Sequence, residues 1–160
     1  MRGGALPPAL ACAALGLALA FVPPRARGFA AAALVLGGFA SALLPWPPRA
    51  EEAAFVLLWG CVIASAASVH LRGGVPTAGA VALGLTTGLA AGAVAALAGS
   101  PGYLALALPA VLLWVPGAWA NARGYGIAPK VLASWLIAIA VLSAALPLVP
   151  TPGYVPDHME

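Results

Sequence analysis

The charged residues of this chain gather in short clusters, and the stretches between the clusters are long and apolar. Only 7% of the 160 residues are charged, which is too few to build a water-soluble surface. The apolar stretches can cross about 30 Å of hydrocarbon as helix, which takes roughly 17 to 25 residues. The charged residues are Arg2, Arg25, Arg27, Arg49, Glu51, Glu52, Arg72, Arg123, Lys130, Asp157 and Glu160. This pattern predicts an all-α fold, a polytopic transmembrane helical bundle.

Six apolar segments are expected to span the membrane. The links between them contain Pro or Gly, because proline cannot continue a helical hydrogen-bond ladder and glycine accepts positive φ. A lipid-exposed sheet would need alternating polarity, which these segments lack. The predicted spans are residues 6–22, 28–46, 53–71, 75–99, 103–120 and 131–149, and residues 150–160 form a polar tail. We expect residues 1–160 to form one integral membrane domain, in which the Ala- and Gly-rich span 75–99 depends on its neighbours to stay inserted.

The basic residues predict the orientation of these spans. With six spans, Arg2 and Arg49 fall on one side of the membrane and the other five basic residues on the opposite side. The five are Arg25, Arg27, Arg72, Arg123 and Lys130. Cytoplasmic links carry an excess of Lys and Arg, so both termini are predicted to lie outside the cytoplasm. The richness in Ala, Gly, Pro and Arg is typical of a GC-rich bacterial genome and favours the cytoplasmic (inner) membrane of a bacterium.

Residues 6–22 have an alternative interpretation as a cleaved signal peptide. Arg2 would be its basic region, and Ala18-Leu19-Ala20 would be the cleavage site. This alternative exports Arg25 and Arg27 directly after the apolar run, against the charge rule. We therefore favour a retained span.

Short resemblances between the two halves of the chain raise the hypothesis of an internal repeat. The matched features are Arg2-Gly3-Gly4 with Arg72-Gly73-Gly74, Gly28-Phe29 with Gly102-Tyr103, and Trp59 with Trp135. Each half would contain three spans, so the halves would be two inverted three-helix repeats, as in many secondary transporters. Chance is the alternative, because a chain this rich in Ala, Leu and Gly produces such matches easily.

Small residues at every fourth position predict close helix packing. Gly84, Gly88 and Gly92 place three glycines on one face of span 75–99, so that a neighbouring backbone can approach. The same spacing occurs at Ala33, Gly37 and Ser41, and at Gly60, Ala64 and Ser68. These faces either pack within one chain or form a homo-oligomeric or partner-subunit interface, and packing within the chain is the more frequent case.

Two prolines in span 103–120 mark a candidate solute site. Pro109 and Pro116 each delete a helical hydrogen bond, and the freed carbonyls can line a cavity. The residues expected around such a site are Thr86, Thr87, Pro109, Trp114 and Pro116. Prolines are also common in spanning helices without any such role.

Groups for catalysis are scarce. His70 and His158 fall on opposite sides of the membrane in the six-span arrangement, and none of the spans contains a carboxylate. Cys12 and Cys61 are expected at one depth, where inert buried thiols are commoner than a redox pair. We therefore expect no enzyme, no cofactor and no metal site.

The sequence favours a non-catalytic subunit or scaffold of a membrane complex. Its partners would be membrane lipids and either further copies of itself or larger membrane-protein subunits. The basic residues are singletons or pairs beside apolar runs, which does not fit a nucleic-acid surface. The alternative is a small-solute permease or channel built from inverted repeats, with a site near the proline-broken fifth span.

Overall fold

Prolines set where several of the helices begin. The computed structural model describes residues 4–98 and 100–146, and within this range every regular element is helical. The elements are α1 (Leu6–Leu19), α2 (Pro24–Ala42), the 3-10 helix η1 (Pro48–Ala50), α3 (Glu51–Ser68), α4 (Thr77–Leu97), α5 (Gly102–Ala107), the 3-10 helix η2 (Leu108–Leu113), α6 (Trp114–Ala122) and α7 (Ile127–Ala145). α2 starts at Pro24, four residues ahead of the expected Gly28. Proline is tolerated in the first turn of a helix, because the backbone N–H that it lacks would have no hydrogen-bond partner within the helix.

Some sequence predictions concern residues outside the described ranges. These are the polar tail 150–160, the end of the sixth span at 147–149, Arg2 and Gly3 of the repeat and orientation arguments, and His158.

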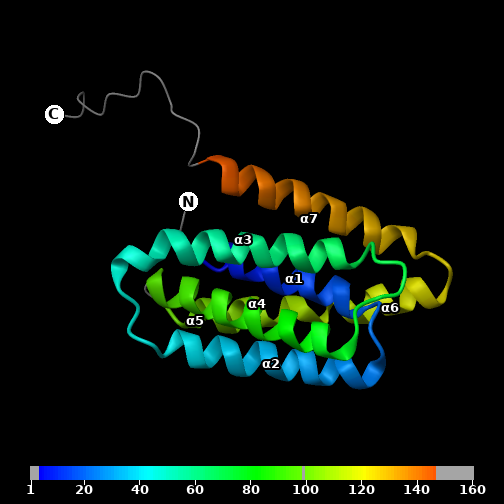
Figure 1. Cartoon of the computed structure of the whole chain (residues 1–160), viewed down its shortest axis with the longest axis horizontal. Coiled ribbons are helices and arrows are strands. Elements are labelled where there is room, and N and C mark those ends of the chain that lie inside the picture. Colours follow the sequence, from blue (N-terminus) through cyan, green and yellow to red (C-terminus); the bar gives the residue numbers. More distant parts are fainter. Residues whose placement is uncertain (1–3, 99, 147–160) are drawn as a thin grey trace.

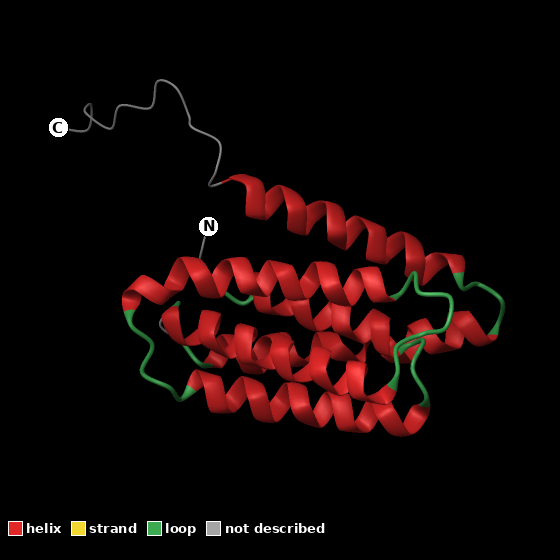
Figure 2. Cartoon of the chain, in the orientation of Figure 1, coloured by secondary structure: helices red, strands yellow, loops and turns green. Residues whose placement is uncertain are grey.

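The helices form rods that lie side by side along one axis (Figure 1). α5, η2 and α6 follow one another without a break and form a single rod, Gly102–Ala122. The links gather at the two ends of the bundle, as Figure 2 shows. α1 lies inside, in contact with α3, α4 and the Gly102–Ala122 rod.

Four helices are long and apolar enough to cross a membrane, which indicates a helical membrane protein. They are Pro48–Ser68, Thr77–Leu97, Gly102–Ala122 and Ile127–Ala145. α1 has 14 residues, or about 21 Å at 1.5 Å per residue. α2 carries Arg25 and Arg27 in its first turn. By length and composition, the described helices thus support four spans, whereas the sequence predicted six.

The closest contact in the bundle joins α2 and α4. A methyl group on Gly84, Gly88 or Gly92 would overlap a backbone carbonyl oxygen of α2. The carbonyls belong to Ala30, Leu34 and Gly38, respectively. Because the residue numbers increase together on both helices, α2 and α4 run in the same direction. The Ser41 hydroxyl adds a hydrogen bond across this contact, 2.7 Å to the carbonyl oxygen of Leu89.

The Gly102–Ala122 rod approaches α1 in a similar way. A methyl group on Gly16 would lie 2.5 Å from the carbonyl oxygen of Val111. Val111 belongs to η2, where the rod winds as a 3-10 helix. Pro109 lies in the same turn and has no N–H to donate, so the regular α-helical bonding is interrupted there. The expected break in the fifth segment is therefore present, and it lies against α1.

α7 lies at the edge of the bundle. It packs mainly on α3, and only 17% of its most apolar window is buried. Large side chains such as Trp135 and Leu142 point away from the protein. An apolar surface of this kind suits lipid or a protein partner.

Replacement of Gly88 by Ala tests the α2–α4 contact. The added methyl group meets the Leu34 carbonyl, so Gly88→Ala should lower the free energy of unfolding by about 1 to 3 kcal/mol. Gly60→Ala is the matched control, since nothing lies within 4 Å of its added carbon and Ala favours helix by up to about 1 kcal/mol. Unfolding of the purified protein in mixed micelles measures both, and equal effects would contradict the contact.

Candidate functional site

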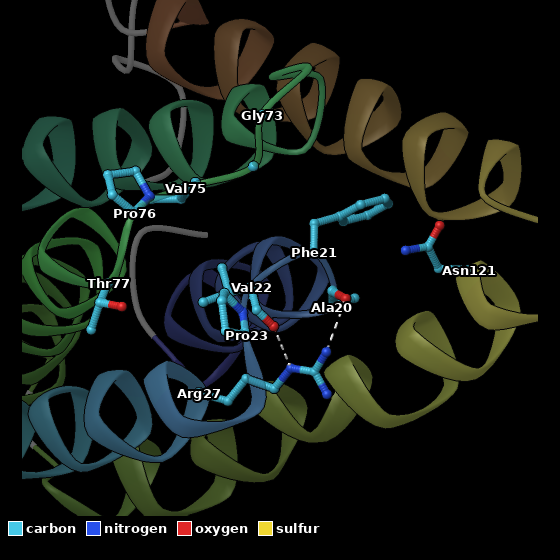
Figure 3. A pocket seen from close by; sticks show the side chains of 11 residues that line it. Ala20, Phe21, Val22, Pro23, Arg27, Gly73, Val75, Pro76, Thr77 and Asn121 are labelled. Carbon is cyan, nitrogen blue, oxygen red and sulfur yellow. Dashed lines mark hydrogen bonds between the residues drawn. The ribbon is translucent and has the colours of Figure 1, made fainter.

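A cleft opens at the end of the bundle where α2 and α4 begin. Its volume is about 710 Å³. It is lined by Ala20, Phe21, Val22, Pro23, Arg27, Gly73, Gly74, Val75, Pro76, Thr77 and Asn121 (Figure 3). The α1–α2 link forms one wall and the α3–α4 link the other. These links meet where Gly74 adopts a positive φ of 68°, and a side chain there would come within 2.9 Å of the Phe21 carbonyl oxygen.

Arg27 is the charged side chain in this cleft. Its Nε donates to the carbonyl oxygen of Val22 at 2.9 Å, and its Nη2 donates to that of Ala20 at 3.3 Å (Figure 3). The guanidinium also lies 5.2 Å from the centre of the Trp114 ring. These contacts hold the half-buried side chain in place and satisfy carbonyls at the end of α1. A guanidinium has five N–H donors, so three remain after the two hydrogen bonds.

Two uncharged polar side chains complete the lining. Thr77 is the first residue of α4, and Asn121 lies in the last turn of α6. Both are exposed. In Figure 3 Asn121 extends toward the cleft from the side opposite Thr77. The cleft therefore combines a fixed cation with a hydroxyl and an amide from three different helices.

The end of the bundle around the cleft is rich in positive charge. Arg25 lies at the start of α2, Arg72 in the α3–α4 link, Arg123 after α6 and Lys130 in the first turns of α7. The described carboxylates, Glu51 and Glu52, lie in the first turn of α3, at the opposite end of the bundle (Figure 1). The cleft therefore lies in a region of positive potential.

The residues expected around a solute site lie on several different surfaces. Pro109 and Pro116 are exposed on the Gly102–Ala122 rod, which packs mainly on α1 rather than on α4. On α4, Thr86 is exposed and bonds back to the Ala82 carbonyl at 2.9 Å, whereas Thr87 is buried. Trp114 is the only one of the five with a contact to the cleft, through Arg27.

The three small-residue faces have different surroundings. Gly84, Gly88 and Gly92 lie against α2. On α2, Gly37 and Ser41 are buried toward α4, and Ala33 is half-buried. On α3, Ser68 is buried, whereas Gly60 and Ala64 are exposed with open space beside Gly60. The described chain therefore covers the first two faces and leaves most of the third uncovered.

Several polar atoms are enclosed in the bundle. Trp59 Nε1, Ser65 Oγ and Thr87 Oγ1 are buried and make no hydrogen bond within the described protein.

Cys12 and Cys61 are buried free thiols. They belong to separate apolar clusters. Among the described residues, no group of three His, Cys, Asp or Glu side chains could hold a metal ion.

The cleft was not predicted from the sequence. In the sequence, Arg27 indicates only the orientation of the spans, and no pattern marks Asn121 or Thr77 as site residues. The sequence does contain a signal for these two residues. Thr77 lies near the start of the predicted span 75–99, and Asn121 directly follows the predicted span 103–120, so both are expected on the same side of the membrane. Which links meet depends on helix pairing, and the sequence does not supply that pairing.

Thiol labelling tests whether the cleft is open to water. Asn121→Cys should react readily with a hydrophilic maleimide, because this position is exposed at the cleft. Thr87→Cys, at a fully buried position, should stay unlabelled. The native Cys12 and Cys61 are 0% and 6% exposed and should give little background. Equal labelling of the two variants would contradict the described arrangement.

Comparison with known proteins gives no relative for this chain. No protein-family model, no curated protein sequence and no solved structure matches it. The function of the chain must therefore be inferred from its own residues and their geometry.

Proposed function

We propose that this chain is a non-catalytic subunit or scaffold of a membrane complex, which binds its partner through the uncovered face of α3. The observation that carries this proposal is the open space beside Gly60. A carbon added there would meet no atom within 4 Å, and the neighbouring Ala64 on the same face is exposed. In lipid, helices associate where small residues let backbones come close. A spanning helix of another subunit could approach α3 there as closely as α4 approaches α2.

The uncovered face runs along much of α3. Its exposed residues follow helical spacing and are small around its centre. They are Ala53, Leu57, Gly60, Ala64 and Ala67. The larger side chain of Leu57, next to these small residues, could pack against the side chains of a partner helix. The partner is a second copy of this chain or a larger membrane protein.

The interior of the bundle supports a structural role. Large apolar side chains are fully buried along its length, among them Leu15, Leu34, Leu58 and Leu104. The cleft beside Arg27 lies at one end of the bundle. Large apolar side chains buried throughout the interior favour a scaffold over a conduit.

We further propose that six rods span the inner membrane of a bacterium with both termini outside the cytoplasm. The rods lie side by side, and the links at the cleft end carry most of the basic residues. α1 is short but packs against α3, α4 and the Gly102–Ala122 rod, whereas α2 begins with two arginines and packs mainly on α4.

The second candidate is a small-solute permease built from inverted repeats. One reciprocal contact favours it. Gly88 of α4 meets the Leu34 carbonyl of α2, and Gly16 of α1 meets the Val111 carbonyl of η2. If α1 corresponds to α4 and α2 to the Gly102–Ala122 rod, each half places a glycine against the second rod of the other half. α1 also packs against α3, whereas α4 and α7, the corresponding helices of the second half, make no comparable contact. The two halves therefore match only in part.

The mass of the complex, purified gently from its native membrane, tests the subunit proposal. We expect a defined larger assembly whose co-purifying chains can be identified. Gly60→Leu should weaken it at least about tenfold, because the side chain fills the space that the partner needs. Ala138→Leu, at an exposed site on α7, is the control and should leave the assembly intact. A lone monomer in the wild type would refute the subunit proposal and favour the permease.

Single cysteines test the orientation. Ala122→Cys, beside Arg123, should be protected from a membrane-impermeant reagent added to intact cells, because it faces the cytoplasm in this proposal. Pro47→Cys, in the link before α3, should be labelled under the same conditions. Both sites are exposed in the folded chain, so lysed cells provide the control for reactivity. The reverse pattern would show that the termini lie in the cytoplasm.

A further inference from the structure

The cleft at the basic end of the bundle has the chemistry of an anion site. We propose that it binds a phosphate group, carried by an anionic lipid headgroup or by free phosphate. Arg27 supplies three unused N–H donors, and Asn121 and Thr77 supply an amide and a hydroxyl. This proposal is independent of the subunit function.

The position of Arg27 favours a bound anion. Two hydrogen bonds and the Trp114 ring fix the guanidinium, so little side-chain freedom remains to be lost when a ligand binds. The planar fork of a guanidinium matches two oxygens of a phosphate group. The described carboxylates lie at the far end of the bundle and cannot neutralise it.

The shape of the cleft admits more than a bare ion. Its volume of about 710 Å³ lies within the range of ligand sites, roughly 300 to 1,000 Å³. Phe21, Val22, Val75 and Pro76 add apolar surface to the polar lining. A basic pocket between helix ends at the membrane surface is where anionic headgroups are bound in other membrane proteins. A lipid headgroup would use both kinds of surface, whereas free phosphate would use only the polar one.

Native mass spectrometry of the full chain provides the test. The protein is released from nanodiscs made of phosphatidylglycerol and phosphatidylcholine in equal amounts. A headgroup site should retain phosphatidylglycerol in preference to phosphatidylcholine. Inorganic phosphate is tested separately in detergent by the shift in unfolding temperature, and a free-phosphate site should give a saturable rise there without lipid preference.

Variants connect either result to the cleft. Arg27→Gln should weaken binding about tenfold, as expected for the loss of a charge-assisted hydrogen bond. Because Arg27 also holds the end of α1, Asn121→Leu provides a second variant, which fills exposed space in the cleft and should weaken binding without loss of the fold. Arg49→Gln, exposed at the opposite end, is the control and should bind as the wild type. Absence of both binding signals, or equal binding by Asn121→Leu and the wild type, would overturn the proposal.

Discussion

Helices in lipid gain little by burying apolar side chains against one another, so their association depends on how closely their backbones can pack. The α2–α4 contact meets this condition with glycines that leave only backbone at its nearest points. Because these helices run in the same direction, both begin at the same end of the bundle. The links that precede them are therefore brought together, and Gly74 lies against the Phe21 carbonyl. The cleft is a consequence of that pairing.

Arg27 connects this packing to the electrostatics of the basic end. A charge that is partly buried among apolar helices is costly unless it finds acceptors or water. Here it finds the carbonyls that the end of α1 leaves free, and the Trp114 ring lies beside it. The same side chain therefore stabilises the α1–α2 turn and lines the cleft with part of its hydrogen-bonding capacity unused.

The sequence predicted the helical membrane class, because few charges and long apolar runs leave no other fold. It predicted the close packing face of Gly84, Gly88 and Gly92, but not that α2 would cover it, since spacing reveals a face and not its neighbour. It also predicted the break at Pro109, yet the break lies against α1 and away from Thr86. The cleft was missed for the same reason, because its residues come from links that meet only after the helices have paired.

The short α1 has a consequence for the order in which the protein is made. Its 14 residues fall short of the hydrocarbon thickness, and such a helix must thin the bilayer or find protein neighbours. Those neighbours include α3 and η2, and the ribosome makes both later than α1. In the proposed six-span arrangement, Gly16 therefore stays uncovered until η2 has been made, and we expect α1 to reach its final depth only after Val111 has been inserted beside it.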